Sequence, residues 1–389
     1  MFAVFKPTRK FAMTTLALVS AAFLAACDTV STGGPSINTS KPVPVALLIP
    51  RGSAQSSDVV LAQSLENSAR LAMQDLQNVE IDLRVYDTAG NAATAATVAE
   101  QAVADGARII LGPVYASAAN SAGLAVLNKN INVLSFSNNT KIAGGNVFVL
   151  GPTFSNTANR LTSYAVRQGK GNMVVVYSTD EAGQLGRQAI EQSIGRSGGS
   201  LGGSVGFARS QRGVSESVPR IRSALDSSGA SSLFLTATTA GALRNYSLLL
   251  PEAGVSPEST QYIGLTRWDI PPETLSLGGL QGGWFALPDP AKSQSFRARY
   301  QATYGGPPHP IGGLAYDGIA AIGALVGSGN PNALTGAALT QSAGFQGVGG
   351  IFRLRPDGTN ERGLAVATIQ NKQVVVIDPA PQSFSGVGF

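Results

Sequence analysis

Short apolar runs rich in β-branched residues alternate with longer segments of helical periodicity from Pro42 onward. The first run, Val43–Pro50, reads VPVALLIP and is almost wholly apolar, which is typical of a parallel strand covered on both faces. Segment 64–76 follows, with leucines and alanines at helical spacing. Because such strand–helix units repeat, we predict an α/β fold built on doubly wound parallel sheets with right-handed crossovers.

The same alternation starts again after Pro152, so we predict two successive α/β sheets. Roughly 360 residues follow the N-terminal segment, a length that suits two lobes. Residues 351–377 differ, since they read as strands joined by tight turns at Arg355–Gly358 and Asn371–Lys372. We expect these antiparallel strands to extend the edge of a sheet.

The only cysteine, Cys27, ends an apolar segment that is preceded by three cations and no acidic residue. This segment is about a dozen residues long, which is too short to span a bilayer. A lone cysteine forms no intramolecular disulfide. The sequence LAAC at 24–27 resembles the lipobox of bacterial lipoproteins, which implies cleavage after residue 26 and acylation of Cys27. We predict a signal peptide over residues 1–26 and a lipid anchor in a bacterial membrane; the alternative is an ordinary secretory signal.

Residues 28–41 are small and polar, and a Gly-Gly-Pro sequence interrupts them, so we predict a flexible tether over 27–42. The net charge of +5 includes the three cations of the signal peptide. No clustered lysines and arginines indicate a nucleic-acid partner.

No motif in the chain indicates catalysis. The only histidine, His309, lies between two prolines in a glycine-rich loop, where a Ser-His-Asp arrangement would need partners brought by the fold. One histidine and one lipidated cysteine do not make a zinc site of N and S ligands, and the acidic residues lack EF-hand spacing. We therefore predict no catalytic residue, no metal and no cofactor.

Ligands of open parallel sheets lie beyond the carboxyl ends of the strands. The residues that follow the predicted strands are rich in hydroxyls, amides and helix N-termini, which suit a carboxylate, although the same types commonly cap helices. Arg51 and Arg267 favour an anionic ligand with Trp268 as a flat apolar face; the alternative is that both arginines are solvated. The predicted ligand cleft comprises Arg51, Tyr115, Ser117, Ser137, Asn138, Asn139, Thr140, Asp180, Thr266, Arg267 and Trp268.

The segments ILGPVYAS, VLSFSNNT, YSTDEAGQLGRQ and GIFRLRPDG occur in the order found in type I periplasmic solute-binding proteins of the leucine/isoleucine/valine-binding type. This resemblance covers nearly all of residues 43–377 and implies two lobes joined by a hinge, with a ligand cleft between them. The first lobe is then expected over 43–155 and 286–345, the second over 156–285 and 346–378, and a tail over 379–389.

The ending FRLRPDGTNERGLAVATI resembles a subgroup described as penicillin-binding protein activators. That resemblance implies a non-catalytic lipoprotein of the periplasm that contacts a peptidoglycan synthase. The alternative is the substrate-binding lipoprotein of an ABC importer for amino acids, which would work with a permease.

The family resemblance also implies an amino-acid grip. Ala116 stands at the place of the serine that binds the α-carboxylate, with Ser117 adjacent, and Asn139 or Thr140 stands at the place of the threonine. For the ammonium group, the hinge aspartate is replaced by Ser155, and the second-lobe tyrosine has no counterpart. The place of the second-lobe acid reads Thr266-Arg267-Trp268, so Asp269 or Asp180 would have to supply the charge. Burial of an ammonium group without a carboxylate costs several kcal/mol, which argues against a zwitterionic ligand.

Overall fold

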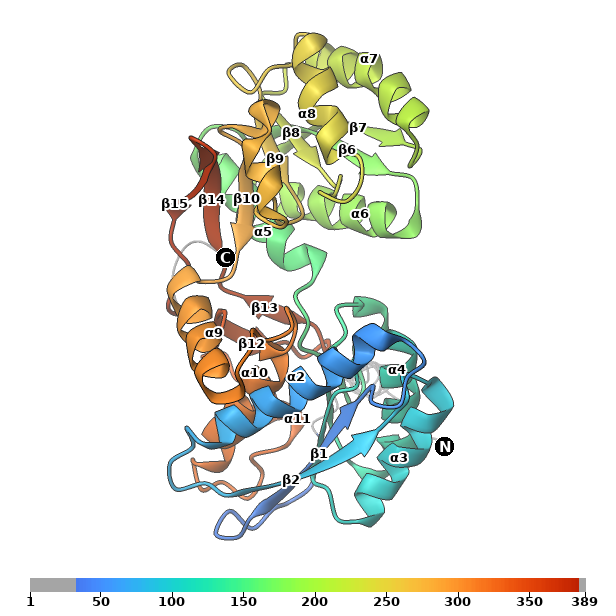
Figure 1. Cartoon of the computed structure of the whole chain (residues 1–389), viewed down its shortest axis with the longest axis vertical. Helices are drawn as coiled ribbons and strands as arrows, with labels where there is room; N and C mark the ends of the chain where they lie inside the picture. Colours follow the sequence, from blue (N-terminus) through green and yellow to red (C-terminus); the bar gives the residue numbers. More distant parts are fainter. Residues whose placement is uncertain (1–32, 385–389) are drawn as a thin grey trace, which may run out of the picture.

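The structure, a computed structural model, describes residues 33–384 and consists of two lobes along its long axis (Figure 1). The chain enters the second lobe before α5 (Phe154–Arg167), returns to the first before α9 (Pro290–Tyr304), and crosses again between β13 (Asn360–Arg362) and β14 (Ala365–Gln370). This arrangement confirms the predicted α/β fold. The predicted signal peptide and Cys27 lie outside the described residues.

A five-stranded parallel sheet with the order β2-β1-β3-β4-β5 forms the first lobe. Alternate residues of β1 face two cores, since Leu47 packs with α2 and α10, and Leu48 packs with α3 and α4. Both faces of the sheet are therefore covered, as the apolar sequence of this strand indicates. The elements of this lobe are β1 (Val43–Ile49), α2 (Ser56–Met73), β2 (Ile81–Asp87), α3 (Ala92–Ala104), β3 (Ile109–Leu111), α4 (Ala116–Val126), η1 (Leu127–Lys129), β4 (Val133–Ser135), η2 (Thr140–Ile142), β5 (Val147–Val149), α9, α10 (Gly313–Val326) and α11 (Gly336–Leu339).

A seven-stranded sheet with the order β15-β14-β10-β9-β8-β6-β7 forms the second lobe. The strands from β7 to β10 are parallel, and β14 and β15 continue the sheet in antiparallel pairing beside β10. The predicted extension of a sheet edge is thus confirmed for residues 365–378, whereas the strands at 350–362 belong to a separate sheet. The elements are α5, β6 (Asn172–Ser178), α6 (Glu181–Arg196), β7 (Ser200–Phe207), α7 (Gln211–Ser228), β8 (Ser232–Leu235), α8 (Leu243–Glu252), β9 (Gln261–Gly264), η3 (Pro272–Ser276), η4 (Gly278–Leu280), β10 (Trp284–Leu287), β14 and β15 (Gln373–Asp378).

A third, antiparallel sheet of β11 (Phe345–Gly347), β12 (Gly350–Leu354) and β13 lies on the first lobe. Phe352 and Leu354 are buried in the core of that lobe, beside α10 and α11. The boundary predicted at residue 346 assigns these strands to the second lobe and differs from this packing, because their apolar side chains face the first core.

The turn between β12 and β13 contacts β5 of the first sheet. Gly358 has φ +78° and its carbonyl accepts a hydrogen bond from the backbone N–H of Val149 at 2.8 Å. A Cβ atom at Gly358 would lie 2.3 Å from the backbone nitrogen of Gly144, so this close approach requires glycine.

Side chains of β13 hold the first crossing, before α5, next to the last crossing, between β13 and β14. Asn360 donates from Nδ2 to the carbonyls of Val149 and Gly151 at 2.7 and 2.8 Å. Arg362 donates to the carbonyl of Leu150 and pairs with Asp317 at 3.0 Å. These buried contacts join the hinge segment before α5 to the last crossing of the chain.

The N-terminal part of the described chain also departs from the prediction of a flexible tether up to residue 42. The Ile37 side chain is 8% exposed and packs in the first core, and its N–H donates to the Pro331 carbonyl at 2.9 Å. Asn130 and Asn132 donate to the carbonyls of Gly34 and Gly33. An apolar anchor and satisfied carbonyls therefore hold residues 33–37 on the first lobe.

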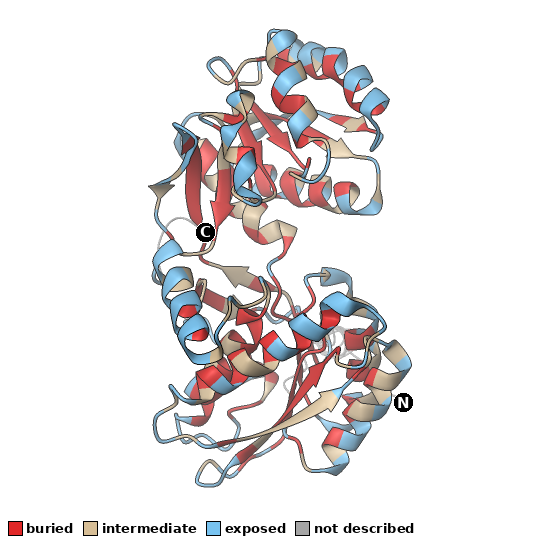
Figure 2. Ribbon diagram, in the orientation of Figure 1, coloured by how far each residue is buried: buried red, intermediate tan, exposed pale blue. Residues whose placement is uncertain are grey.

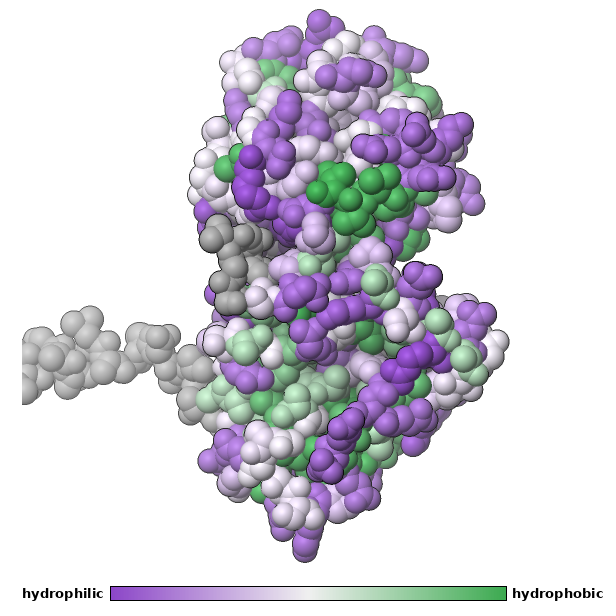
Figure 3. Space-filling model, turned by 90° about the vertical axis from the view of Figure 1, so that its left-hand side faces the viewer, coloured by the Kyte–Doolittle hydropathy of each residue, from purple (hydrophilic) through white to green (hydrophobic). Residues whose placement is uncertain are grey.

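Buried residues concentrate in the strands and on the inward faces of the helices (Figure 2). Figure 3 shows a largely hydrophilic face with an apolar patch on the second lobe. At the free edge of the large sheet, β15 exposes Val375 and Val376. Within residues 33–384, none of the helices combines the length and hydropathy of a membrane span.

Candidate functional site

The carboxyl ends of the parallel strands in both lobes carry the predicted cleft residues. In the first lobe, Arg51 follows β1, Tyr115 follows β3, and Ser137 follows β4. In the second lobe, Asp180 follows β6, and Thr266 follows β9. Parallel strands end at one edge of a sheet, so each lobe gathers its set on one side.

A cavity of about 400 Å³ lies between the lobes. Of the predicted residues, Asn138, Asn139 and Thr140 form its first-lobe wall. Its second-lobe wall is one face of α6 from Glu181 to Gln192, together with the start of α5 at Phe154. An ion pair at 2.7 Å between Lys141 and Glu181 spans the lobes beside it. We call this space the interlobe cavity.

A neighbouring cavity of about 380 Å³, the second-lobe cavity, lies at the ends of β6–β9. Phe154 and Ala182 line both cavities, so the two are adjacent. Hydroxyl, amide and charged groups from four connections surround it, and a few apolar side chains complete the wall. Its polar side chains are those of Ser178, Asp180, Arg209, Ser210, Gln211, Thr236, Thr238, Asn245 and Thr266.

Asp180 is the electrostatic centre of the second-lobe cavity. It caps α6 by accepting from the N–H of Gly183 at 2.9 Å, and it also accepts from the Ser178 hydroxyl at 2.7 Å. Arg209 pairs with its other oxygen at 2.8 Å. These donors, the Ser178 hydroxyl first, hold the pKa of Asp180 below its usual value, so the carboxylate is ionised at neutral pH.

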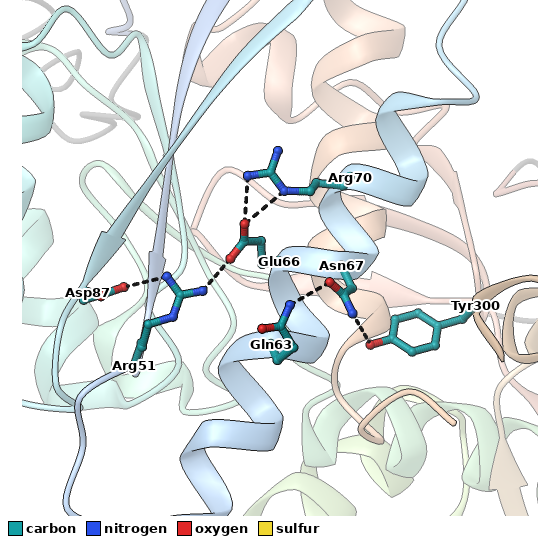
Figure 4. A network of polar contacts seen from close by, with 7 residues as sticks. All are labelled: Arg51, Gln63, Glu66, Asn67, Arg70, Asp87 and Tyr300. Carbon is teal, nitrogen blue, oxygen red and sulfur yellow. Dashed lines mark hydrogen bonds and ion pairs between the residues drawn. The ribbon is translucent and has the colours of Figure 1, made fainter. Parts of the chain in front are cut away.

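Arg51 is not free to bind an anion (Figure 4). Its guanidinium pairs with Glu66 and, at 3.4 Å, with Asp87, and Glu66 also pairs with Arg70 on the same helix. Burial opposes the ionisation of Glu66, but the two arginines lower its pKa overall. Two carboxylates therefore occupy the guanidinium of Arg51, whose side chain is still 42% exposed to solvent.

Trp268 does not offer a flat apolar face to a ligand. Its side chain is 0% exposed and lies in the second-lobe core, 6.3 Å from the ring centroid of Phe285. Arg267 points its charge at Asp269, with Nε 2.9 Å from Oδ1. The indole packs directly against Gly264 and Gly283, where a Cβ atom would lie 2.3 and 2.4 Å from its ring. The segment Thr266–Asp269, from which an exposed indole was predicted, contains neither glycine.

Tyr115 and Ser117 lie apart from the interlobe cavity walls described above. The Tyr115 hydroxyl donates to Asp58 at 2.6 Å, and burial, followed by this carboxylate, raises the pKa of Tyr115 to about 12. Ser117 is exposed at the start of α4, and Ser137 is buried and accepts from the N–H of Asn139. Both serines therefore have local structural surroundings that suit helix and turn formation.

Several polar residues of the site escaped the sequence reasoning. Asp58 is 2% exposed, and its Oδ2 has no hydrogen-bond partner among the described residues. Arg209 and Ser210 follow β7, whose glycine-rich sequence obscured the end of the strand. Ser210 caps α7, so the sequence signal that was available is a serine three residues before Gly213 at the start of a helix.

The geometry suits reversible binding of a small polar ligand more than bond-making. Cavities of about 300–1,000 Å³ are typical of small-molecule sites. The walls supply an ionised carboxylate, a guanidinium and several hydroxyls. In residues 33–384, no group of three or more His, Cys, Asp or Glu side chains is placed to hold a metal ion.

Comparison with known proteins agrees with this geometry. The family model described as "Periplasmic binding protein" matches residues 42–373. A search of curated proteins found no match.

Solved structures with this fold come from several bacteria. A branched-chain amino acid ABC transporter protein from Rhodospirillum rubrum is 18% identical, with a TM-score of 0.72 over 87% of this chain and 100% of that one. An ABC transporter substrate-binding protein from Desulfitobacterium hafniense in complex with Leu has the same identity and coverage and a TM-score of 0.61. A branched-chain amino acid transporter substrate-binding protein from Streptococcus pneumoniae in complex with isoleucine is 15% identical, with a TM-score of 0.55 over 87% of this chain and 100% of that one. At these identities the likeness establishes the fold.

Proposed function

The chain belongs to the periplasmic binding protein family, and on this premise we propose that it is a non-catalytic, extracytoplasmic solute-binding protein whose interlobe and second-lobe cavities together bind an amino acid for an ABC importer. The observation that carries the proposal is one cavity of about 400 Å³ between the lobes, lined by polar side chains of the loop after β4 in the first lobe and of helix α6 in the second. The printed descriptions of the similar structures, which name branched-chain amino acid transport and bound Leu or isoleucine, support the substrate class.

In this proposal Asp180 receives the ammonium group of the ligand, and first-lobe donors receive its carboxylate. Asp180 is ionised and lines the second-lobe cavity, which shares Phe154 and Ala182 with the interlobe cavity. The side chains of Asn138 and Thr140 line the opposite wall and carry hydrogen-bond donors. An amino acid would then exchange the Asp180–Arg209 pair for contacts with its own charges.

The test is a panel of amino acids measured by calorimetry on the mature, detergent-solubilised protein. We expect saturable binding of at least one member and a loss of about tenfold or more in affinity for Asp180→Asn, the size of one charge-assisted hydrogen bond. Asparagine is an equally good helix cap, so the variant keeps α6. Asp226→Asn, on exposed α7, is the matched control and should bind as the native protein does. Absence of binding across the panel would overturn the proposal.

A second candidate function, contact with a peptidoglycan synthase as in penicillin-binding protein activators, is favoured by one observation. The two second-lobe acids that would hold an ammonium group, Asp180 and Asp269, already pair with Arg209 and Arg267. In that case the amino-acid panel would give no binding, and capture from solubilised membranes would recover a synthase. Recovery of no synthase with the lipid anchor intact would count against this second function.

We further propose that acylated Cys27 anchors the protein to a bacterial membrane from the periplasmic side. The supporting observations are the cationic start, the short apolar segment and the LAAC sequence before the described residues. Mass spectrometry of the mature protein should show a lipid on Cys27. Cys27→Ala should release the protein into the soluble fraction, whereas an unmodified thiol in the mature protein would exclude the anchor.

A further inference from the structure

A third cavity, of about 720 Å³, lies where the hinge, α5, the last turns of α6 and the β12–β13 hairpin meet. We call it the hinge cavity. It adjoins the interlobe cavity, with which it shares Thr140, Thr153, Ser155 and Gln192, but most of its wall is separate. Apart from Val166, every lining residue has a polar or charged side chain, so the cavity suits a hydrophilic ligand.

Arginines dominate the charge of this wall. Arg167, Arg196, Arg353 and Arg355 line it together with only two carboxylates, Asp357 and Glu361, which leaves two net positive charges. Glu361 pairs with both Arg353 and Arg355, so one carboxylate charge is shared between two guanidinium groups. Guanidinium groups bind carboxylates and phosphates through paired hydrogen bonds, so this excess favours an anion.

Arg196 is the arginine with the weakest internal partner. It donates to the amide oxygen of Asn159 at 2.7 Å, and no carboxylate lies within ion-pair distance of it in the described part of the chain. It comes from the second lobe, whereas Arg353 and Arg355 come from the hairpin that packs on the first lobe. A ligand with two anionic groups would therefore contact both lobes at once.

Asn360 adds a second requirement. Its side chain is 4% exposed and lines the cavity, and its Nδ2 is fully used by the two hinge carbonyls. Its Oδ1 is buried without a hydrogen-bond partner among residues 33–384. Because an unsatisfied buried acceptor is costly, a ligand hydroxyl that displaced the atoms covering Oδ1 would gain more than an ordinary surface hydrogen bond.

From these observations we propose that the hinge cavity binds a hydroxylated polycarboxylic acid or sugar acid, separately from the ligand of the interlobe cleft. One anionic group contacts Arg196, another contacts Arg353 and Arg355, and a hydroxyl donates to Asn360. Since the wall is drawn from both lobes, occupancy biases the hinge and couples to binding in the cleft, and the coupling is reciprocal.

The experiment uses the mature full-length protein in detergent, with citrate as the probe and tricarballylate, which lacks the hydroxyl, as its matched analogue. We expect calorimetry to show saturable citrate binding and several-fold weaker tricarballylate binding. Arg196→Ala and Arg355→Ala should each weaken citrate by about tenfold, the size of one charge-assisted hydrogen bond. Arg212→Ala removes the same charge from exposed α7, where Arg212 is 88% exposed, and should change nothing.

Arg209→Ala separates this site from the second-lobe cavity, since Arg209 lines that cavity alone. Citrate binding that survives Arg209→Ala and fails in Arg196→Ala supports the hinge cavity, whatever the outcome of the amino-acid panel. Loss in Arg209→Ala, equal loss in Arg212→Ala, or no saturable binding overturns the proposal. Equal affinity for tricarballylate overturns the role of Asn360 and the hydroxylated class. Circular dichroism of each variant in citrate-free buffer confirms that it is folded.

Discussion

The hinge side and the cleft side of this molecule join the same two lobes by opposite means. On the hinge side, Asn360 and Arg362 donate hydrogen bonds to the backbone carbonyls of the first crossing. The Arg362 side chain is 10% exposed, and its partner Asp317 is 2% exposed. On the cleft side, the ion pair of Lys141 and Glu181 joins side chains that are 58% and 76% exposed. Buried, multiply bonded contacts hold one geometry, whereas an exposed pair exchanges readily with water.

This difference teaches where motion is permitted. We expect the hinge segments to keep their contacts when the cleft opens, because separation at Lys141 and Glu181 exposes little that was buried. The interlobe cavity lies beside this pair, on the easily opened side. A solute-binding function needs that asymmetry, since the ligand enters through the side that opens.

The strongest way to break the comparison is Arg362→Ala. Burial raises the pKa of Asp317, and Arg362 is the charge that opposes this effect. Its loss leaves the buried Asp317 carboxyl with only the Val348 N–H, and the Leu150 carbonyl without its side-chain donor, so we expect the free energy of unfolding to fall by about 3 kcal/mol. Urea denaturation measures this change. Arg355→Ala, at an exposed arginine of the same hairpin, is the control, and a loss below about 1 kcal/mol in Arg362→Ala would contradict the assignment.

Asn156→Ala tests the second lobe's contribution to the hinge. Asn156 and Thr153 form a capping box at the start of α5, and the Asn156 amide donates to the Asn360 carbonyl at 2.9 Å. Loss of the box and of this bond should lower the free energy of unfolding by about 1–2 kcal/mol. Thermal unfolding checks it, and an unchanged midpoint would show that the first crossing does not depend on this cap.

Most of the fold was predictable from the sequence, and the misses have physical reasons. Continuous apolar runs such as Val43–Ile49 identify strands that are covered on both faces. Helix α2 begins at Ser56, eight residues before the predicted segment at Ser64. The prediction missed its first turns because Val59 and Val60, which are 63% and 61% exposed, do not follow the apolar periodicity of the helix. The packing of β12 on the first lobe depends on contacts between distant segments, which local patterns do not contain.

The site was less predictable than the fold. The rule of strand ends selected Asp180 and Thr140, which line cavities in the structure, because the rule depends only on topology. It gave no information on partners. Arg51 pairs with Glu66 on the next helix, and Trp268 is buried against Gly264 and Gly283, and both contacts depend on how the chain folds back on itself.

Asp75→Asn sharpens the comparison with a contact that lies wholly within the first lobe. Arg299, with help from the Tyr316 hydroxyl, lowers the pKa of Asp75 below its ordinary 3.8. A lowered folded pKa stabilises the fold at higher pH, and this stabilisation is lost as the pH falls through and below 3.8. Because both partners are more than a third exposed, we expect Asp75→Asn to cost less than about 1 kcal/mol at pH 7.

Denaturation at pH 7 and pH 3 tests this sign. The difference between native and variant proteins should shrink at the lower pH, because below 3.8 the unfolded native chain gains stability by binding a proton on Asp75. The small-angle scattering profile should be the same for both proteins, since the contact does not cross the hinge. A larger difference at pH 3 than at pH 7 would contradict the assigned pKa direction.

Lys141→Ala should have the smallest effect on stability and the most specific effect on shape. The hydrogen bond from Lys141 lowers the pKa of Glu181, but both side chains are exposed to solvent. We therefore expect no measurable change in the free energy of unfolding. The lobes lose their bridge beside the interlobe cavity, and the radius of gyration from scattering should rise slightly at low salt. High salt should remove the difference by screening the pair in the native protein. A variant that is both destabilised and unchanged in shape would mean that the cleft side is held like the hinge side, and the asymmetry between the two would not exist.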